Sequence, residues 1–203
     1  MKTILFASSL RPFRANDRVL KLVTARLTAL GRTVDIVDPK DTKLSILQTP
    51  LQYYGNPNNI PSELHKLSSF IKKADMLMFT TCEYFWSTPP GLSNLPDNLL
   101  PDTLAYKAAG IIGYSPGFNG ASLSSANLAQ RLIQLGCLVV PHRVYLGRVN
   151  ERVSEGGDPM GSEEQCCHMT AEIDLVIKQI TYVAQRLLRQ KPTTPRPRLH
   201  PYC

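Results

Sequence analysis

The sequence predicts an α/β fold in which one parallel β-sheet carries helices on both faces. Short apolar segments alternate along the chain with segments whose apolar residues recur at helical spacing. Two of the apolar segments, Met76–Thr81 and Ala108–Tyr114, are continuous, as in strands that are buried on both faces. Because right-handed crossovers place the intervening helices on both sides, this alternation indicates a doubly wound, five-stranded sheet.

Each expected element is defined by its apolar pattern and by the residues that bound it. The expected strands are Lys2–Ala7, Thr33–Val37, Met76–Thr81, Ala108–Tyr114 and Leu138–Tyr145. The expected helices begin at a cap formed by Asn16 or Asp17, at Pro61 and near Gly91, and span Leu123–Leu135 and Met169–Leu188. Gly31 and Gly136 stand where the first and fourth of these helices should end.

The 203 residues suit one domain, which we place at residues 1–190, followed by a tail at 191–203 with four prolines. The net charge of +7 lies mainly in the closing helix and this tail, because six cations and no acid follow Asp174. The rest of the chain is therefore nearly neutral, and no aromatic interleaving supports nucleic-acid binding.

Cysteine usage and hydropathy favour a cytoplasmic protein without membrane spans. The five cysteines are an odd number without the spacing of a disulfide framework. Cys166, Cys167 and His168 have no second ligand group at metal-site spacing, so we expect no metal. The apolar start is too short for a signal peptide and runs into arginines, and we interpret it as the first strand.

In such a sheet ligands bind at the carboxyl ends of the strands, which singles out three loops. The first, Ser8–Asn16, offers a phosphate the Ser9 hydroxyl, the Arg11 and Arg14 guanidinium groups, the Asn16 amide and the start of a helix. It lacks the glycine patterns of dinucleotide and P-loop sites, and a solvated turn with two arginines is the alternative.

The second and third loops suggest contacts to a flat ring. Cys82–Pro90 contains the only tryptophan within an aromatic run, Tyr84-Phe85-Trp86, which suits either a planar ligand or a dimer interface. The third loop, Ser115–Gly120, is rich in glycine, which allows the backbone to approach a ligand; a plain turn is the alternative.

Together these residues resemble the NADPH-dependent FMN reductase family, which includes related quinone and azo reductases. The family's first loop reads roughly G-S-x-R-x-x-S-x-N, and Ser9, Arg11 and Asn16 match it. Its second loop reads roughly P-E-Y-N-G-S-x-P-G-x-L-K-N-x-x-D. This chain matches that pattern at Glu83, Tyr84, Ser87, Pro89, Leu92, Asn94 and Asp97. The resemblance covers about residues 1–190.

The resemblance implies a flavodoxin-like fold with strand order 2-1-3-4-5, a homodimer or homotetramer, and FMN as the cofactor. It also implies hydride transfer from NADPH or NADH to the flavin N5, then reduction of a flavin, quinone or azo-type acceptor. The chemistry belongs to the cofactor, so no side chain is assigned a catalytic role. The expected FMN-binding residues are Ser9, Arg11, Arg14, Asn16, Glu83, Tyr84, Phe85, Trp86, Ser87, Ser115, Gly117 and Gly120.

The chain departs from the family pattern at the second loop above all. Phe85 and Trp86 replace an Asn-Gly turn, so an unchanged turn would hold Trp86 at a positive φ that favours glycine. Ser8, Arg14 and Cys82 are further departures. The main alternative is therefore a flavin-free interaction or regulatory protein on a reductase scaffold. A flavodoxin-like electron carrier and nucleic-acid binding through the tail are the other two.

Overall fold

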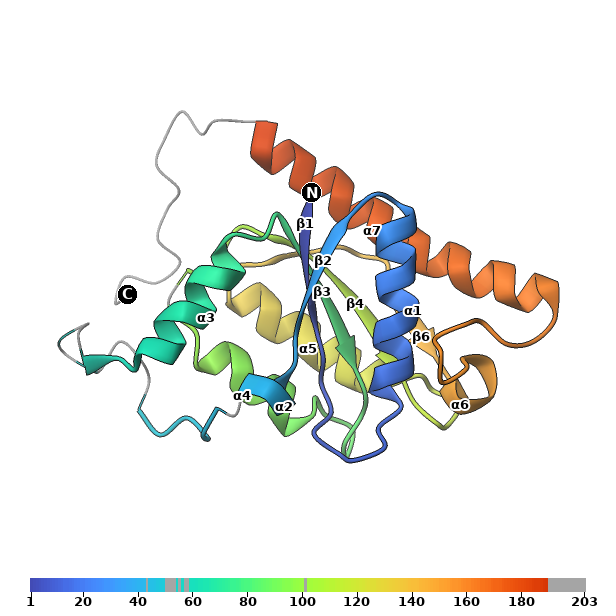
Figure 1. Ribbon diagram of the computed structural model, residues 1–203, viewed down its shortest axis with the longest axis horizontal. Coiled ribbons are helices and arrows are strands. Elements are labelled where there is room, and N and C mark those ends of the chain that lie inside the picture. The colour runs from blue at the N-terminus through green and yellow to red at the C-terminus, as the bar shows by residue number, and fades with distance from the viewer. Residues whose placement is uncertain (43, 50–53, 55, 57–58, 101, 190–203) are drawn as a thin grey trace.

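The sheet of the protein contains the strands that the sequence predicts, in the predicted order. A computed structural model describes residues 1–42, 44–49, 54, 56, 59–100 and 102–189. The strands β1 (Lys2–Phe6), β2 (Thr33–Val37), β3 (Met76–Thr81) and β4 (Ala108–Tyr114) all pair in parallel. The order β2-β1-β3-β4-β5 is that of a flavodoxin-like sheet, which confirms the predicted fold class (Figure 1).

The fifth strand differs from its prediction because it is interrupted. Two short strands, β5 (Leu138–Val139) and β6 (Val144–Leu146), replace the single expected strand, and both pair in parallel with β4. Pro141 lies between them and has no N–H to donate to β4. The next N–H, that of His142, donates to the Gln179 side chain of the last helix at 3.3 Å. The sheet therefore has six strands.

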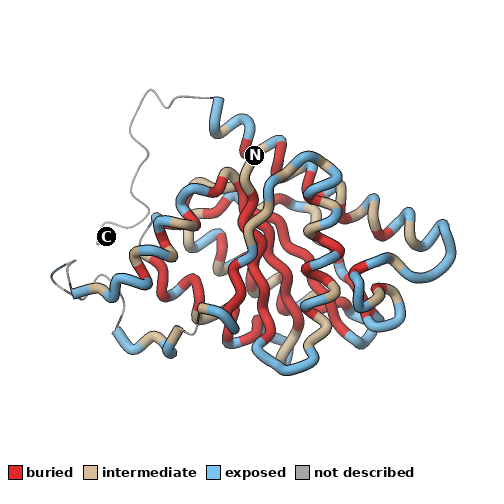
Figure 2. Tube along the Cα trace, viewed as in Figure 1, coloured by how far each residue is buried: buried red, intermediate tan, exposed pale blue. Residues whose placement is uncertain are grey.

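The helices form two layers, one on each face of the sheet (Figure 1). Helices α1 (Asn16–Ala29) and α7 (Glu163–Arg189) share one buried apolar cluster with alternate strand residues such as Leu5 and Met78. Helices α3 (Ser62–Lys72), α4 (Pro90–Asp97) and α5 (Ser122–Gln134) share the other, with Ile4 and Leu77. Figure 2 shows the strands buried between these layers.

Some helix boundaries differ from the predicted ones. The last helix begins six residues earlier than expected, at Glu163, because the side chain of Ser162 accepts a hydrogen bond from the N–H of Gln165 at 3.3 Å. Two single-turn helices were not anticipated, α2 (Pro39–Thr42) and α6 (Val149–Arg152). Within the residues that the structure describes, no helix has both the length and the apolar character needed to cross a membrane.

Candidate functional site

The loops that follow β1, β3 and β4 lie together at the carboxyl edge of the sheet, at the bottom of the view in Figure 1. Hydrogen bonds connect them. The Ser9 hydroxyl in the first loop lies 2.7 Å from the Tyr84 hydroxyl in the second. Glu83 in the second loop accepts a hydrogen bond from the amide of Asn119 in the third at 3.2 Å. The three predicted loops therefore form one surface.

Asn16 is buried and organises the first loop from below. Its side-chain oxygen accepts hydrogen bonds from the N–H groups of Ser8 at 2.8 Å and Ser9 at 3.3 Å. Its amide nitrogen donates to Thr80 on β3 at 2.9 Å. The side chain of Asn16 therefore supports the loop instead of facing a ligand. The expectation that Asn16 or Asp17 caps the helix is wrong, because the N-cap residue is Ala15 and no side chain caps α1.

Arg14, which was predicted at a phosphate, is engaged by groups of the chain itself. Its guanidinium is buried against Asp38 at the end of β2 and also bonds Asp17 and the Ser9 carbonyl oxygen. Burial favours the neutral guanidinium, but hydrogen bonds to Asp38 and Asp17 outweigh it and raise the pKa of Arg14. Burial also favours the neutral carboxyl of Asp38, but the bond from Arg14 lowers its pKa overall.

Arg11 is the cation that remains exposed in the first loop. Its guanidinium carbon lies 4.1 Å from the centre of the Tyr84 ring, and Arg11 forms no ion pair with any described residue. The N–H groups of the first turn of α1 have no side-chain cap. Hydroxyl, guanidinium and helix N–H groups are the donors that bind phosphate, so this part of the loop suits a phosphate group.

The second loop forms a tight hairpin turn with two aromatic residues at its tip. The N–H groups of Tyr84 and Ser87 each donate to the other residue's carbonyl oxygen at 3.0 Å. Phe85 has φ 48° and Trp86 has φ 62°, so both adopt the left-handed backbone of a type I′ turn. The turn has this geometry although Phe85 and Trp86 stand in place of Asn-Gly. Both aromatic residues are exposed, at 102% and 73%. Ser87 contributes its backbone, and its side chain is exposed.

Glu83 supplies the cap of α5 instead of facing a ligand. One carboxylate oxygen accepts hydrogen bonds from the N–H groups of Leu123 at 3.1 Å and Ser124 at 3.2 Å. The helix has no side-chain cap of its own, because its N-cap residue is Ala121. The carboxylate therefore occupies the positive end of α5 and fixes the second loop to it.

The predicted residues of the third loop hold the loop in shape. The Ser115 hydroxyl donates to the Gly117 carbonyl oxygen at 3.0 Å and accepts from the Gly120 N–H at 3.1 Å. Gly120 has φ 57°, and a Cβ atom there would lie 2.6 Å from the backbone of Tyr145. A Cβ atom at Gly117 would enter open space, with the Ser115 hydroxyl oxygen as its nearest neighbour at 4.0 Å.

Three residues of this edge were not predicted from the sequence. Asp38 follows the second strand, and an acid after a parallel strand is a signal that could have found it. Phe118 is 80% exposed, and the Arg148 guanidinium carbon lies 4.1 Å from the centre of its ring. Arg148 follows the end of the predicted fifth strand, but the sequence does not show that its side chain meets the Phe118 ring.

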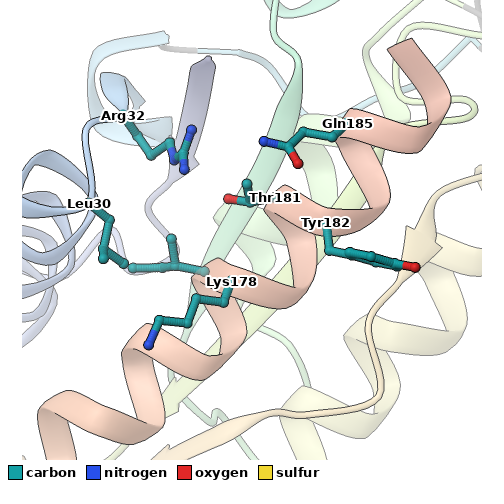
Figure 3. A pocket seen from close by; sticks show the side chains of 7 residues that line it. Leu30, Arg32, Lys178, Thr181, Tyr182 and Gln185 are labelled. Carbon is teal, nitrogen blue, oxygen red and sulfur yellow. The ribbon is translucent and has the colours of Figure 1, made fainter. Parts of the chain in front are cut away.

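A separate cavity of about 150 Å³ lies between α7 and the end of α1 (Figure 3). It is lined by Leu30, Arg32, Ile177, Lys178, Thr181, Tyr182 and Gln185. Arg32 directly precedes β2, and the Thr181 hydroxyl contacts the sulfur of Met76 at the start of β3. The cavity therefore lies at the amino edge of the sheet, opposite the candidate site.

The sequence matches one known protein family. A sequence model of the NADPH-dependent FMN reductase family matches residues 1–151, which include all three loops. The chain belongs to this family. No curated protein matches the chain significantly.

Solved structures of similar fold include several oxidoreductases. The flavoenzyme NAD(P)H:(acceptor) oxidoreductase FerB from Paracoccus denitrificans is 20% identical, with TM-score 0.72, over 89% of this chain and 97% of that one. An oxidoreductase from Corynebacterium diphtheriae is 16% identical, with TM-score 0.61, over 94% and 98%. RosB with a bound flavin-derived intermediate is 19% identical, with TM-score 0.67, over 96% and 82%. At these identities the likeness concerns the fold of this reductase-family chain.

Proposed function

We propose that this FMN reductase family member binds FMN at the carboxyl edge of its sheet and uses it to oxidise NADPH or NADH. The observation that carries the proposal is that two groups of donors in the first loop have no side-chain acceptor among the described residues. The α1 N-terminus has no side-chain cap, and Arg11 has no anionic partner among the described residues. The α5 N-terminus nearby is already occupied by Glu83.

The residues present fit FMN when their roles are divided between direct contact and support. Arg11 and the N–H groups of α1 would hold the phosphate, next to the buried Ser9 hydroxyl, which already bonds Tyr84 and the Arg11 N–H. The second-loop residues Tyr84 to Ser87 and the backbone of Ser115–Gly120 would surround the flavin ring system. Asn16, Arg14 and Glu83 would keep these loops in position, because the structure engages all three in buried or capping bonds.

FMN supplies, when bound, a two-electron redox centre between the nicotinamide and a small acceptor such as a flavin, quinone or azo compound. Backbone N–H groups of the second and third loops would donate hydrogen bonds to the ring system and favour its negatively charged reduced form. The Arg11 guanidinium, which lies over the Tyr84 ring, would pair with the phosphate. No described acid is free at the tip of the second loop, since the Glu83 carboxylate caps α5.

We also propose a homo-oligomer, a domain of residues 1–190 and a cytoplasmic location. The homo-oligomer is proposed from the resemblance to the reductase family. The four described cysteines are all free thiols, as in proteins of a reducing compartment. The alternative, a flavin-free interaction protein, rests on Phe85 and Trp86 and requires that their rings exclude the cofactor.

The deciding experiment is a visible absorption spectrum after the protein has been incubated with FMN and desalted. We expect retained flavin bands that NADPH or NADH bleaches, and comparison of the two donors identifies the preferred one. Absence of retained flavin, together with no change of FMN fluorescence on titration, would falsify the proposal.

A matched pair of ligands tests the phosphate contact. Arg11→Ala should weaken FMN binding by about tenfold or more, because a charge-assisted hydrogen bond is lost. Riboflavin lacks the phosphate, so its affinity should change much less. Arg131→Ala removes a guanidinium that pairs with Asp97 between α4 and α5 and serves as the control. Equal losses for both ligands would assign Arg11 to the ring or to the fold.

A further inference from the structure

We propose that the Phe85–Trp86 turn is the acceptor-selecting element of this protein, which binds planar, two-ring aromatic electron acceptors by stacking. The inference rests on the proposed flavin-dependent function and adds what that function leaves open, namely which acceptors are used. It starts from the two residues in which this chain departs from the Asn-Gly turn of its family.

The turn keeps a strained backbone although its two aromatic residues are largely exposed. Phe85 and Trp86 have φ values of 48° and 62°, in the region that favours glycine and asparagine. Burial within the chain does not offset this strain, because the residues are 102% and 73% exposed. Strained, exposed aromatic residues in a binding region indicate a function outside the chain's own packing.

The base of the turn, in contrast, is held firmly. Tyr84 and Ser87 bond each other through both backbone groups at 3.0 Å. The carbonyl oxygen of Trp86 accepts a hydrogen bond from the Asn127 amide on α5 at 3.0 Å. Glu83, the residue before Tyr84, accepts a hydrogen bond from the Ser124 N–H at the start of α5. The Tyr84 hydroxyl lies 2.7 Å from the Ser9 hydroxyl. The two rings therefore project from a preorganised base, which reduces the ordering cost of binding a ligand.

The chemistry of the tip defines the ligand class. An indole and a phenyl ring present flat, apolar faces, which bind other flat rings by offset stacking. No free acid accompanies them in the described part of the second loop, since Glu83 is engaged. Phe118 and its partner Arg148 add a further exposed ring in the neighbouring loop, which Asn119 ties to Glu83. This composition favours bicyclic quinones and flavins over acceptors without an aromatic face.

The reaction that these residues would select is the two-electron reduction of a quinone by NADPH or NADH. NADPH or NADH gives up a hydride and leaves as the oxidised nicotinamide. The quinone gains two electrons and two protons, one proton originating from the hydride and one from solvent, and leaves as the hydroquinone.

The single tryptophan provides a binding test that does not depend on turnover. The FMN-loaded, oxidised protein is titrated without nicotinamide, with 2-methyl-1,4-naphthoquinone in one series and ferricyanide in another. We expect the naphthoquinone to cause saturable quenching and a blue shift of Trp86 emission, because stacking removes the exposed indole from water. Ferricyanide should quench only by collision, linearly with concentration and without a shift.

Variants then test selection during turnover, with FMN at saturating concentration throughout. We expect the double variant Phe85→Asn, Trp86→Gly to lower the kcat/KM for the naphthoquinone, relative to that for ferricyanide, by at least tenfold. Trp86→Phe keeps an aromatic face and should retain most of this ratio. Tyr182→Ala removes an exposed ring on α7, at the other edge of the sheet, and should leave the ratio unchanged.

The outcomes separate this inference from the function on which it rests. If the protein retains no FMN, the proposed function fails. If it retains FMN but the acceptor ratio is equal in the double variant and the wild type, the selecting role is refuted. A blue shift of Trp86 that follows protein concentration, with dimer formation in light scattering and no acceptor present, would assign the rings to a second copy and also refute it.

Discussion

At the scale of single residues, the pair of Arg14 and Asp38 shows how the candidate site is supported from beneath. Both side chains are nearly buried, with 5% and 10% of their surfaces exposed. Removal of the Asp38 carboxylate leaves the buried Arg14 guanidinium with the more exposed Asp17 as its acidic partner. The pair therefore holds the first loop to the end of β2 and leaves Arg11 as the exposed cation.

We predict that Asp38→Asn lowers the free energy of unfolding by about 3 kcal/mol at neutral pH. The pKa of Asp38 is lower in the folded protein than in the unfolded chain, where it is about 3.9. Its contribution is therefore complete above about pH 4 and is lost as the pH falls through the lowered pKa. Urea unfolding between pH 2 and 7 should show a steeper acid loss in the wild type than in Asp38→Asn. Parallel pH profiles would contradict the assignment.

Substitution of two glycines of the third loop should affect the stability of the protein very differently. Gly120→Ala should lower the free energy of unfolding by about 2–5 kcal/mol, because φ is 57° and the new Cβ would approach Tyr145 at 2.6 Å. Gly117→Ala enters open space and should change it by no more than about 0.5 kcal/mol. Thermal or urea unfolding of the two variants measures the difference. Equal effects would show that the packing of Gly120 against β6 is not what requires glycine.

At the scale of elements, the hairpin turn and the helix starts determine how the loops are presented. The turn retains a type I′ backbone with aromatic residues because both ends are fixed, by the Tyr84–Ser87 pair and by the bond from Asn127. α1 begins without a side-chain cap, whereas α5 begins on the carboxylate of Glu83. One helix start thus has no side-chain cap, with Asp17 in its first turn, and the other is capped by Glu83.

Substitution of the two turn residues should stabilise the protein, although they belong to the candidate site. Phe85→Asn, Trp86→Gly should raise the free energy of unfolding by about 1–2 kcal/mol, because positive φ suits the new residues and little buried apolar surface is lost. The wild type and the variant are compared by urea unfolding without FMN. A lower stability of the variant would mean that the rings contribute to the fold.

At the scale of the whole molecule, the buried core lies within the α/β domain. The two apolar clusters on either side of the sheet begin at Ile4 and Leu5 and end with Ala184 of α7. The predicted tail, residues 191–203, lies outside the described residues. Among the described residues these clusters run from the first strand to α7, and a domain of residues 1–190 remains our proposal.

We predict that removal of residues 191–203 changes the free energy of unfolding by no more than about 0.5 kcal/mol and leaves FMN retention intact. The truncated and full-length chains are compared by thermal unfolding and by flavin absorbance after desalting. A control titration with DNA at several salt concentrations tests the tail itself. Salt-sensitive binding by the full chain alone would assign the tail to nucleic acid.

The sequence, with its family resemblance, predicted the first four strands, the strand order and the edge at which the three loops meet, but not the break at Pro141 between β5 and β6. The strands β2, β3 and β4 have the predicted bounds. For β3 and β4 the reason is that strands buried on both faces leave continuous apolar runs, which depend on local sequence. The resemblance through the second-loop motif also predicted the family and the strained backbone of Trp86. Both depend on short stretches of sequence.

Only the tertiary structure decided which of the predicted site residues remain free. Arg11 and Arg14 stand three residues apart with the same charge, but Arg14 meets Asp38 from another strand and Arg11 meets a tyrosine ring. The Glu83 carboxylate likewise caps α5, a helix that begins some forty residues later. A side chain's partner depends on residues that are distant in sequence, and the approach of those residues is a property of the folded chain.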